Sequence, residues 1–262
     1  MKNSFDNLLI DTKLRLLKMH HEANAGHIGG NFSSIDALMA LHHLVMQADD
    51  RFVISKGHSA GALYATLWSL GQLSDEALST FTLDDSVLPG HPSGGGIPGL
   101  LFSTGSLGHG PSLSAGLALA ARHRRTSQRV FCLCSDGEWQ EGSCWEALTF
   151  AVHQRLDNLA ILIDQNGLQG FGRTRDVISC EDLGPRVAAF GAHVRNVDGH
   201  DPAAIAEALH SPGPGVPVVL ILDTVKGKGL HFEDRLESHY LPLTSEQYLA
   251  ARDTLMGKGN AS

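Results

Sequence analysis

The sequence predicts an α/β fold, in which a parallel sheet carries helices on both faces. Short apolar runs that suit buried strands alternate with segments of helical periodicity. The predicted strands are residues 51–54, 129–134, 159–163, 192–197 and 217–222. The predicted helices are residues 6–20, 33–45, 60–70, 112–123, 143–153, 202–209 and 244–256. Because parallel strands need long crossover connections, this alternation indicates a parallel sheet covered on both sides.

In three segments the local sequence supports the predicted helix or loop. Ser33 and Ser34 are favourable N-cap residues, so a helix is expected to begin there. Arginines that follow the small-residue helix at 112–123 suit the negative end of its dipole. Residues 84–108 are rich in Gly, Pro and Ser and have no regular period, and so long a loop in a compact chain indicates a functional or a disordered segment.

Composition narrows the class of protein. The 262 residues are 42% hydrophobic and 18% charged, which fits one globular domain over residues 1–262. A formal charge of −8 disfavours nucleic acid or an anionic membrane as a partner. No apolar run reaches the roughly 18 residues of a membrane span, and the N-terminus lacks a signal-peptide core. A soluble cytoplasmic protein is expected.

The four cysteines do not form a disulfide framework in a chain of this length. They are Cys132, Cys134, Cys144 and Cys180. Cys132 and Cys134 alternate along one predicted strand, so their side chains should share a face as reduced core residues.

An acid and an amide follow two consecutive predicted strands. Asp136 ends one strand, and Asn166 comes just after the next. If the strands are neighbours, both side chains meet at the carboxyl edge, where doubly wound sheets bind ligands. A carboxylate and an amide oxygen suit a hard cation such as Mg²⁺, with room left for phosphate oxygens. The alternative is purely structural: Asp136 caps the next helix, and Asn166 makes a turn with Gly167.

Four loops in the first 110 residues combine glycine with histidine. They are residues 26–30, 55–58, 90–92 and 104–110. Their number suggests imidazoles gathered around a phosphorylated ligand. The last loop leads into a predicted helix, whose free amides and dipole favour an anion.

These features together resemble the N-terminal, diphosphate-binding domain of transketolase, in the form divided between two chains. The resemblance covers nearly the whole sequence, and Ser135-Asp136-Gly137 followed by Asn166 matches the family's thiamine diphosphate motif. It implies that Asp136, Asn166 and the carbonyl of Leu168 hold Mg²⁺ (or Ca²⁺) with the cofactor's diphosphate.

The resemblance assigns further roles, position by position. The residues expected to contact the cofactor are Asp136, Asn166, His58, Gly105, Leu107, Gly137 and Lys226. His27 and His91 match histidines that bind the sugar's hydroxyls and assist proton transfer, and His239 matches a further histidine near diphosphate and substrate. All three are candidate acid–base groups, so we expect their pKa values to lie near neutrality. Glu141 and Glu146 match acids that link two active sites across a dimer. For Lys226, an exposed loop lysine is an equally good interpretation.

The resemblance also implies a partner chain. The glutamate that activates thiamine, and the residues that bind sugar phosphate, lie in a later domain of the family, and this chain ends at Ser262. We therefore expect a C-terminal, pyrimidine-binding subunit, with two copies of each chain in the assembly. The expected reaction transfers a two-carbon ketol unit from a ketose to an aldose. The alternatives are 1-deoxyxylulose-5-phosphate synthesis or a related acyl transfer, and a non-catalytic assembly subunit.

Other features are given structural roles. The helical histidines are predicted to be surface or satisfied core residues rather than zinc ligands, and they are His20, His21, His42, His43 and His153. Ser135 replaces the usual first glycine of the motif, Gln165 stands where the split family often has asparagine, and Pro111 falls early in a helix. None of these departures removes a proposed ligand.

Overall fold

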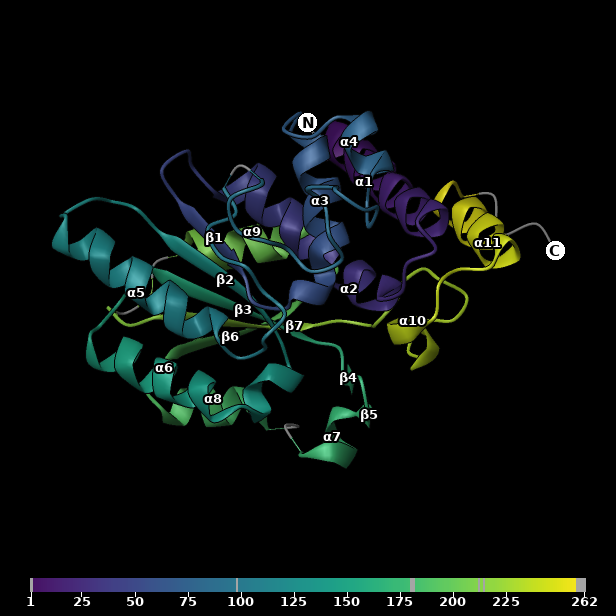
Figure 1. Cartoon of the computed structure of the whole chain (residues 1–262). Coiled ribbons are helices and arrows are strands. Elements are labelled where there is room, and N and C mark those ends of the chain that lie inside the picture. The colour runs from purple at the N-terminus through teal and green to yellow at the C-terminus, as the bar shows by residue number, and fades with distance from the viewer. Residues whose placement is uncertain (1, 98, 180–181, 212, 214, 258–262) are drawn as a thin grey trace.

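The computed structural model describes residues 2–257 apart from residues 98, 180–181, 212 and 214. Five parallel strands form its main sheet in the order β1-β2-β3-β7-β6 (Figure 1). They are β1 (Arg51–Ile54), β2 (Val130–Ser135), β3 (Leu159–Gln165), β6 (His193–Asp198) and β7 (Val218–Asp223). All five predicted strands are therefore confirmed, as is the parallel α/β class.

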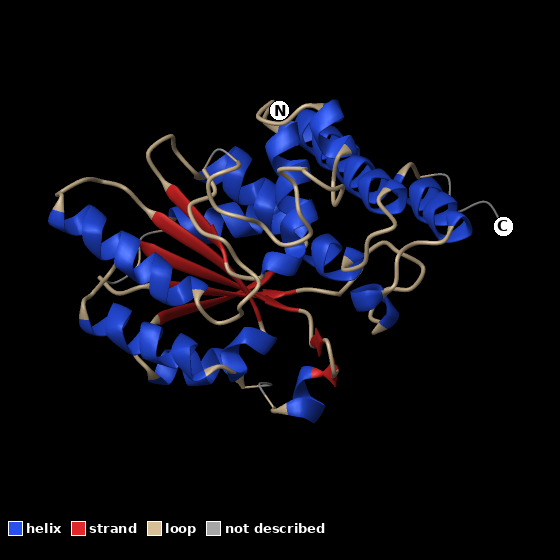
Figure 2. Cartoon of the chain, viewed as in Figure 1, coloured by secondary structure: helices blue, strands red, loops and turns tan. Residues whose placement is uncertain are grey.

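Helices cover both faces of this sheet (Figure 2). The described helices with at least seven residues are α1 (Lys2–Glu22), α2 (Ile28–Ala40), α3 (Ala60–Ser69), α5 (Gly110–His123), α6 (Gly142–His153), α8 (Leu183–Ala189), α9 (Pro202–His210) and α11 (Ser245–Leu255). One apolar cluster joins α1, α2, α3 and α9 to the sheet, and a second joins α5, α6 and α8 to its other face. Successive side chains of β2 point alternately into one cluster and the other, because neighbouring residues of a strand face opposite sides of the sheet.

The cysteines of β2 occupy the second of these clusters. Cys132 and Cys134 are buried with their sulfurs 3.6 Å apart, and both are free thiols. The prediction that they share a core face is confirmed. Cys144 is also buried and free, and Cys180 lies outside the described residues.

The start of α2 corrects the sequence prediction. The helix begins at Ile28 rather than at Ser33, so the second half of the first glycine–histidine loop is helical. Ser33 and Ser34 are buried within the helix and cap nothing, because their hydroxyls donate to the backbone of Gly30 and to a buried carboxylate. The helix then continues as a π-helical turn over Leu41–Val45.

Several short elements have no clear periodicity in the sequence and were not predicted. They are α4 (Asp75–Ser79), α7 (Thr174–Val177), α8, α10 (Glu237–Tyr240), and the hairpin of β4 (Leu168–Gln169) and β5 (Gly172–Arg173). So few residues cannot form a stable helix or hairpin without tertiary contacts, which the sequence pattern does not record. Residues 84–108, apart from residue 98, contain no helix or strand, as predicted.

The first helical turn of α5 lies against the end of β1. A side chain at Gly110 would overlap Ser55, whereas Gly116 in the same helix has open space around it. We expect Gly110→Ala to lower the free energy of unfolding by about 1–3 kcal/mol through overpacking. Gly116→Ala should raise it by about 0.5–1 kcal/mol through helix propensity. Urea denaturation measures both, and equal effects of the two substitutions would contradict this packing.

Candidate functional site at the carboxyl edge of the sheet

Asp136 and Asn166 follow neighbouring strands. β2 pairs directly with β3, with Ser135 opposite Asp164, so the two strand ends meet at one edge. One carboxylate oxygen of Asp136 accepts a hydrogen bond of 2.8 Å from the amide of Gly167, next to Asn166. The expected convergence is therefore confirmed.

Both residues also make the local contacts of the structural alternative. The carboxylate of Asp136 accepts from the amide of Gly137 at 2.8 Å and so caps a short 3₁₀ turn at Gly137–Gln140. The side-chain oxygen of Asn166 accepts from the amide of Leu168 at 3.1 Å. Beside them is a cavity of about 350 Å³, whose lining includes Asp136, Asn166 and Thr224. Apolar side chains therefore do not fill the space next to the two strand ends.

A buried carboxylate beneath the edge holds several segments together. Asp164 is fully buried and forms an ion pair with Lys56, which is equally buried. Its oxygens also accept from Ser33 at 2.6 Å, from Asn166 at 3.1 Å and from Thr224. Burial opposes ionisation, but the Lys56 ammonium and these hydrogen bonds outweigh it and hold the pKa of Asp164 below its usual value.

Sequence reasoning did not assign a role to Asp164. An acid inside an otherwise apolar strand was the available signal, because a buried charge requires a partner. The partner, Lys56, lies 108 residues away, so the sequence could not identify it.

Burial and neighbouring acids also affect the metal-ligand candidate. Burial raises the pKa of Asp136 to about 6, and the nearby Asp164 carboxylate adds to this effect. A cation bound at Asp136 would favour the charged form and reverse the shift. The raised pKa therefore indicates a place where positive charge is favoured.

Lys226 is inside the site. Only 1% of its surface is exposed, so the interpretation as an exposed loop lysine is wrong. Its ammonium donates to the carbonyl of Leu168 at 3.1 Å and lies 2.8 Å from Nδ1 of His239. Burial, followed by repulsion from Lys56, lowers the pKa of Lys226 to about 8.

Histidines from three of the four glycine–histidine loops gather at one place with the histidine of α10, whereas His109 of the fourth loop is exposed. The ring centre of His27 lies 5.7 Å from that of His58, 5.6 Å from that of His91 and 4.9 Å from that of His239. The rings of His58 and His239 are 5.7 Å apart. The expected cluster of imidazoles is therefore present.

The expected near-neutral pKa values are wrong for His27 and His239. Burial, aided by His91 and Lys226, lowers the pKa of His27 to about 4. Burial and Lys226 lower that of His239 to about 3, and burial lowers that of His91. His58 is shifted well below its usual value by burial and then by Lys56. The four rings are therefore neutral at pH 7 in the chain alone.

The loop before α5 approaches β1 closely. A side chain at Gly57 would overlap Thr104 and crowd the amide of Gly105, so glycine is required there. Gly105 has a φ of 132°, a conformation that favours glycine. Leu107 is 39% exposed in the same loop. At Gly137, a side chain would come within 2.7 Å of Gln169, so glycine keeps this turn close to the hairpin.

An internal carboxylate occupies part of the helix N-terminus where an external anion was expected. The fully buried Glu138 accepts from the amide of Gly108 at 2.9 Å and from Ser55. Ser55 in turn accepts from the amide of Gly110 at 3.2 Å. The amides of Gly108 and Gly110 thus already donate to side chains of the chain itself. This corrects the prediction that the free amides at this helix start bind an external anion. Sequence reasoning gave Glu138 no role, since its partners are distant loops.

The remaining predicted residues lie nearby or on the surface. Glu141 and Glu146 are exposed at the start of α6. Ser135 donates from its backbone and side chain to Glu138, at 2.7 and 3.2 Å, so the departure from glycine adds a contact. Pro111 lies in the first turn of α5, where proline is tolerated.

Two of the helical histidines are not satisfied core residues. The Nε2 atoms of His20 and His42 are buried without a hydrogen-bond partner among the described residues, so the prediction is wrong for this pair. Burial lowers the pKa of each to about 4. His153 is exposed, and His21 stacks on Tyr248 with ring centres 4.5 Å apart.

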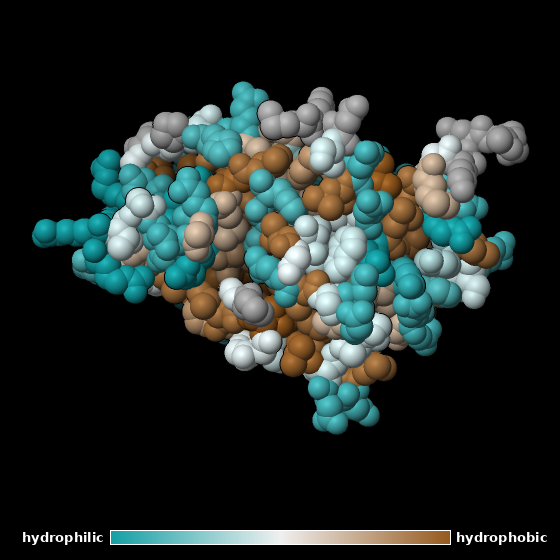
Figure 3. Space-filling view, turned by 90° about the horizontal axis from the view of Figure 1, so that it is seen from above, coloured by the Kyte–Doolittle hydropathy of each residue, from teal (hydrophilic) through white to brown (hydrophobic). Residues whose placement is uncertain are grey.

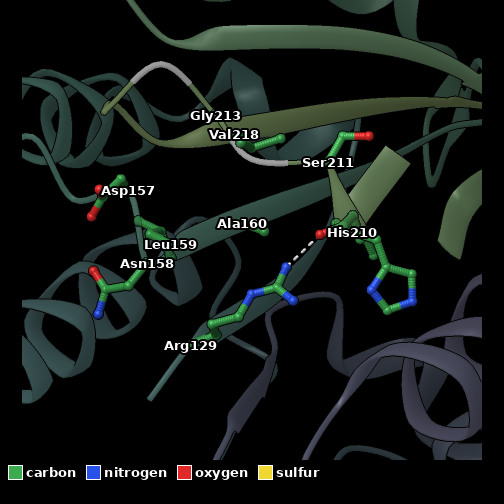
Figure 4. A pocket seen from close by; sticks show the side chains of 10 residues that line it. Arg129, Asp157, Asn158, Leu159, Ala160, His210, Ser211, Gly213 and Val218 are labelled. Atoms are coloured by element: carbon green, nitrogen blue, oxygen red, sulfur yellow. Dashed lines mark hydrogen bonds between the residues drawn. The ribbon is translucent and has the colours of Figure 1, made fainter. Parts of the chain in front are cut away.

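A separate cavity of about 330 Å³ lies at the opposite end of the sheet, near the starts of β3 and β7 (Figure 4). Arg129 points across it and donates to the carbonyl of Leu209 at 2.7 Å. Because ligands of such sheets bind beyond the carboxyl ends of the strands, this cavity does not belong to the candidate site.

Residues 6–260 match the family model described as "Transketolase, thiamine diphosphate binding domain". The chain belongs to this family. The match includes Asp136, Asn166 and the gathered histidines, and it confirms the resemblance drawn from the sequence.

Relatives of similar length share more than a third of the residues. The chain is 38% identical over 240 residues to one of the subunits of an apulose-4-phosphate transketolase, from Actinobacillus succinogenes, covering 87% of each chain. It is 37% identical over 246 residues to a 6-deoxy-6-sulfo-D-fructose transketolase subunit of a Clostridium species, covering 89% of this chain and 90% of that one. It is also 37% identical to human transketolase over 200 residues, which are 74% of this chain and 31% of that one.

Solved transketolases have the same fold. The enzyme from Leishmania mexicana matches with a TM-score of 0.87 and 27% identity over 97% of this chain and 41% of its own. The enzyme from Pichia stipitis in complex with sedoheptulose-7-phosphate matches with a TM-score of 0.86 and 29% identity over 97% and 41%. The chain thus spans about two fifths of these solved enzymes. It is a transketolase-type transferase polypeptide built on a thiamine diphosphate-binding domain.

The ion pair beneath the site gives a stability prediction. Asp164→Asn leaves Lys56 buried without its counter-charge and should lower the free energy of unfolding by about 3–5 kcal/mol at pH 7. Asp253→Asn, which breaks the exposed pair with Arg252, should cost about 0–1 kcal/mol. Denaturant titration measures both, and equal losses would contradict the assigned role of Asp164.

The same pair sets a pH dependence. The pKa of Asp164 is lower in the folded chain than its ordinary value of 3.8, so its stabilisation is complete above that value and is lost as the pH falls through the folded pKa. The difference in stability between the natural chain and Asp164→Asn should therefore shrink in acid.

Proposed function

We propose that this chain is the N-terminal subunit of a two-chain, thiamine diphosphate-dependent transketolase-like enzyme that transfers a two-carbon ketol unit from a ketose, such as a ketose phosphate, to an aldose. The supporting observation is that Asp136, Asn166, Lys226 and the cluster of imidazoles meet at one edge of the sheet. This arrangement combines oxygen ligands for a cation with donors for a phosphorylated ligand.

The donor set fits a hard divalent cation. Asp136 offers a carboxylate, Asn166 an amide oxygen and Leu168 a main-chain carbonyl, and oxygen ligands suit Mg²⁺ or Ca²⁺. Across the described ranges, no group of three or more His, Cys, Asp or Glu side chains could hold a metal ion. The cation would therefore need further oxygens from the diphosphate and water. The Leu168 carbonyl accepts from Lys226, so a cation bound there requires Lys226 to change partner.

Residues around the cation site would hold the diphosphate. We assign this role to His58, Gly137, Lys226 and the backbone of Gly105 and Leu107. The low pKa values of His58 and Lys226 result partly from crowded positive charge, which an anion would relieve. Thiamine diphosphate, when bound, supplies the electron sink for cleavage and formation of the carbon–carbon bond.

The histidines facing that space would handle the sugar and its protons. A neutral imidazole donates a hydrogen bond from one nitrogen and accepts at the other. His27, His91 and His239 can thus bind sugar hydroxyls and move a proton between a hydroxyl and water. Nδ1 of His239 faces the Lys226 ammonium, which fixes that nitrogen as the acceptor when Lys226 is charged.

A partner chain would complete the site. Large apolar side chains are exposed around the carboxyl edge, including Leu101 and Leu107 before α5, Phe171 at 88% in the β4–β5 hairpin, Tyr240 at the end of α10 and Leu241 just after it. From above, apolar residues gather over the middle of the visible face (Figure 3). Exposed apolar groups of this kind mark association surfaces.

We propose that the partner is a C-terminal, pyrimidine-binding subunit that contributes the activating glutamate. Two copies of each chain would assemble, with Glu141 and Glu146 at the contact between active sites; both acids are exposed. The relatives named as transketolase subunits support a two-chain enzyme. Their names also favour ketol transfer over 1-deoxyxylulose-5-phosphate synthesis.

The remaining expectations are part of this proposal. The chain would act as a single domain in the cytoplasm, in line with its reduced, buried cysteines. Within the described part of the chain, no helix is long and apolar enough to cross a membrane.

Calorimetric titration tests the cofactor assignment. Thiamine diphosphate and Mg²⁺ should bind the chain with its partner, and Asp136→Ala should weaken Mg²⁺-dependent binding by at least tenfold and abolish ketol transfer, because it removes the only carboxylate of the cation site. Glu207→Ala, at an exposed position of α9, serves as the control for cofactor affinity in the same assay. Retained activity of Asp136→Ala would instead support a non-catalytic assembly subunit.

Lys226 should make cofactor binding take up a proton. Its pKa of about 8 leaves it largely neutral at pH 8.5, and a bound diphosphate favours the ammonium form. Titration at pH 8.5 in buffers of different ionisation enthalpy should therefore show an uptake of up to roughly three quarters of a proton, and Lys226→Met should abolish it. At pH 7 the contribution of Lys226 falls, since it is already protonated. An unchanged proton uptake in Lys226→Met would place the diphosphate elsewhere.

A further inference from the structure

Another cavity is lined in part by residues of the histidine cluster. It measures about 330 Å³ and has His20, His27, His58 and His91 in its lining. His20 comes from the end of α1 and is only 1% exposed. None of the roles proposed above involves His20.

Two histidines that line this cavity each have a buried nitrogen atom without a partner. The two atoms are Nε2 of His20 and Nδ1 of His27, and among the described residues nothing hydrogen-bonds to either. A buried polar atom without a partner carries a free-energy penalty, so both atoms indicate a ligand or water in the cavity.

The tautomer of His20 follows from its other nitrogen. Nδ1 lies 3.4 Å from the carbonyl of Ala25, so it must carry the proton and donate. Nε2 is then a lone-pair acceptor, and burial keeps the ring neutral at pH 7 by lowering its pKa to about 4. The missing partner of His20 is therefore a hydrogen-bond donor.

The surroundings fix the position of this acceptor. A side chain at Gly61 of α3 would overlap Nε2 of His20, so glycine is required for the ring to lie there. Phe81 packs against the same ring, with centres 5.2 Å apart. The side-chain amide of Asn31 donates to the carbonyls of His27 and His58, at 2.8 and 3.0 Å, and so holds the backbone of two other residues that line the cavity.

The lining excludes a charged ligand. It contains no lysine, arginine, aspartate or glutamate, and its histidines have lowered pKa values, so a phosphate would find no counter-charge. A single water needs only about 10–15 Å³, so the volume exceeds that need many times over. It falls at the lower end of the range for small-molecule pockets. A neutral ligand rich in hydroxyl groups meets these conditions.

We propose that this cavity is a sugar subsite, in which Nε2 of His20 accepts a hydrogen bond from a hydroxyl of the substrate's polyhydroxyl chain. The inference rests on the proposed ketol transfer, because the cavity adjoins the histidines assigned to the sugar. His27 is common to both, because its ring lies 5.6 Å from that of His91 and His27 also lines this cavity. His20 thereby becomes a determinant of sugar specificity.

Kinetics of the two-chain enzyme test this role. His20→Leu removes the acceptor at similar volume and should raise KM for fructose-6-phosphate and sedoheptulose-7-phosphate about 2- to 10-fold, the range of one neutral hydrogen bond, with kcat nearly unchanged. KM for hydroxypyruvate, which offers the ketol unit without a polyhydroxyl chain, should not change. His20→Gln should restore part of the loss. An equal effect on hydroxypyruvate, or no effect on any donor, would overturn the inference.

His42 provides the matched control. It is also a buried histidine with an unpartnered Nε2 and a pKa of about 4, but it lines a different cavity of about 530 Å³. His42→Leu should leave all the KM values unchanged. The same rise in KM for sugars in His42→Leu would assign the effect to lost packing and reject the subsite.

A direct measurement separates this inference from the proposed function and needs no variant. Imidazole ¹⁵N resonances of the two-chain protein without thiamine diphosphate, so without turnover, should shift at His20 and not at His42 when fructose-6-phosphate is added. A shift at His20 in a protein that shows no ketol transfer with cofactor would uphold the subsite and reject the proposed function. Ketol transfer without a shift at His20 would do the reverse.

Discussion

The candidate site depends on one buried ion pair at the end of β3. Asp164 binds Lys56, Thr224 and Asn166, and each of these lies at or within two residues of a proposed cofactor contact. His58 follows Lys56 by two residues, and Lys226 follows Thr224 by two. Through Ser33 the same carboxylate also anchors α2, which begins just after His27. A single charge thus sets the relative positions of four chain segments.

This arrangement has an electrostatic consequence for the site above it. Lys56 and Lys226 are both buried, and only Lys56 has a fully buried carboxylate as its direct partner. Burial, followed by repulsion from neighbouring lysines, lowers the pKa values of His58, His239 and Lys226. This repulsion is unfavourable in the chain alone, and an anion bound beside these groups would relieve it. The part of the site around Lys226 therefore favours an anion, whereas the part around Asp136 favours a cation.

The sequence predicted what depends on strand periodicity and little that depends on long-range contacts. Asp136 and Asn166 could be placed because the ends of parallel strands meet at one edge, whatever the details of packing. Glu138 and His20 could not, because their roles arise from partners or cavities built by other loops. The prediction of near-neutral pKa values for His27 and His239 was wrong for the same reason, because burial is a property of the folded chain.

The structural and the functional interpretation of Asp136 and Asn166 are compatible. The carboxylate has about four lone-pair positions, and the amides of Gly137 and Gly167 use two of them. The side-chain oxygen of Asn166 accepts one hydrogen bond from Leu168 and keeps a second lone pair, while its NH₂ group is held by Asp164. The amide therefore cannot flip without breaking contacts at both ends. The local turns of the structural alternative would thus also orient the remaining oxygen lone pairs toward the proposed cation.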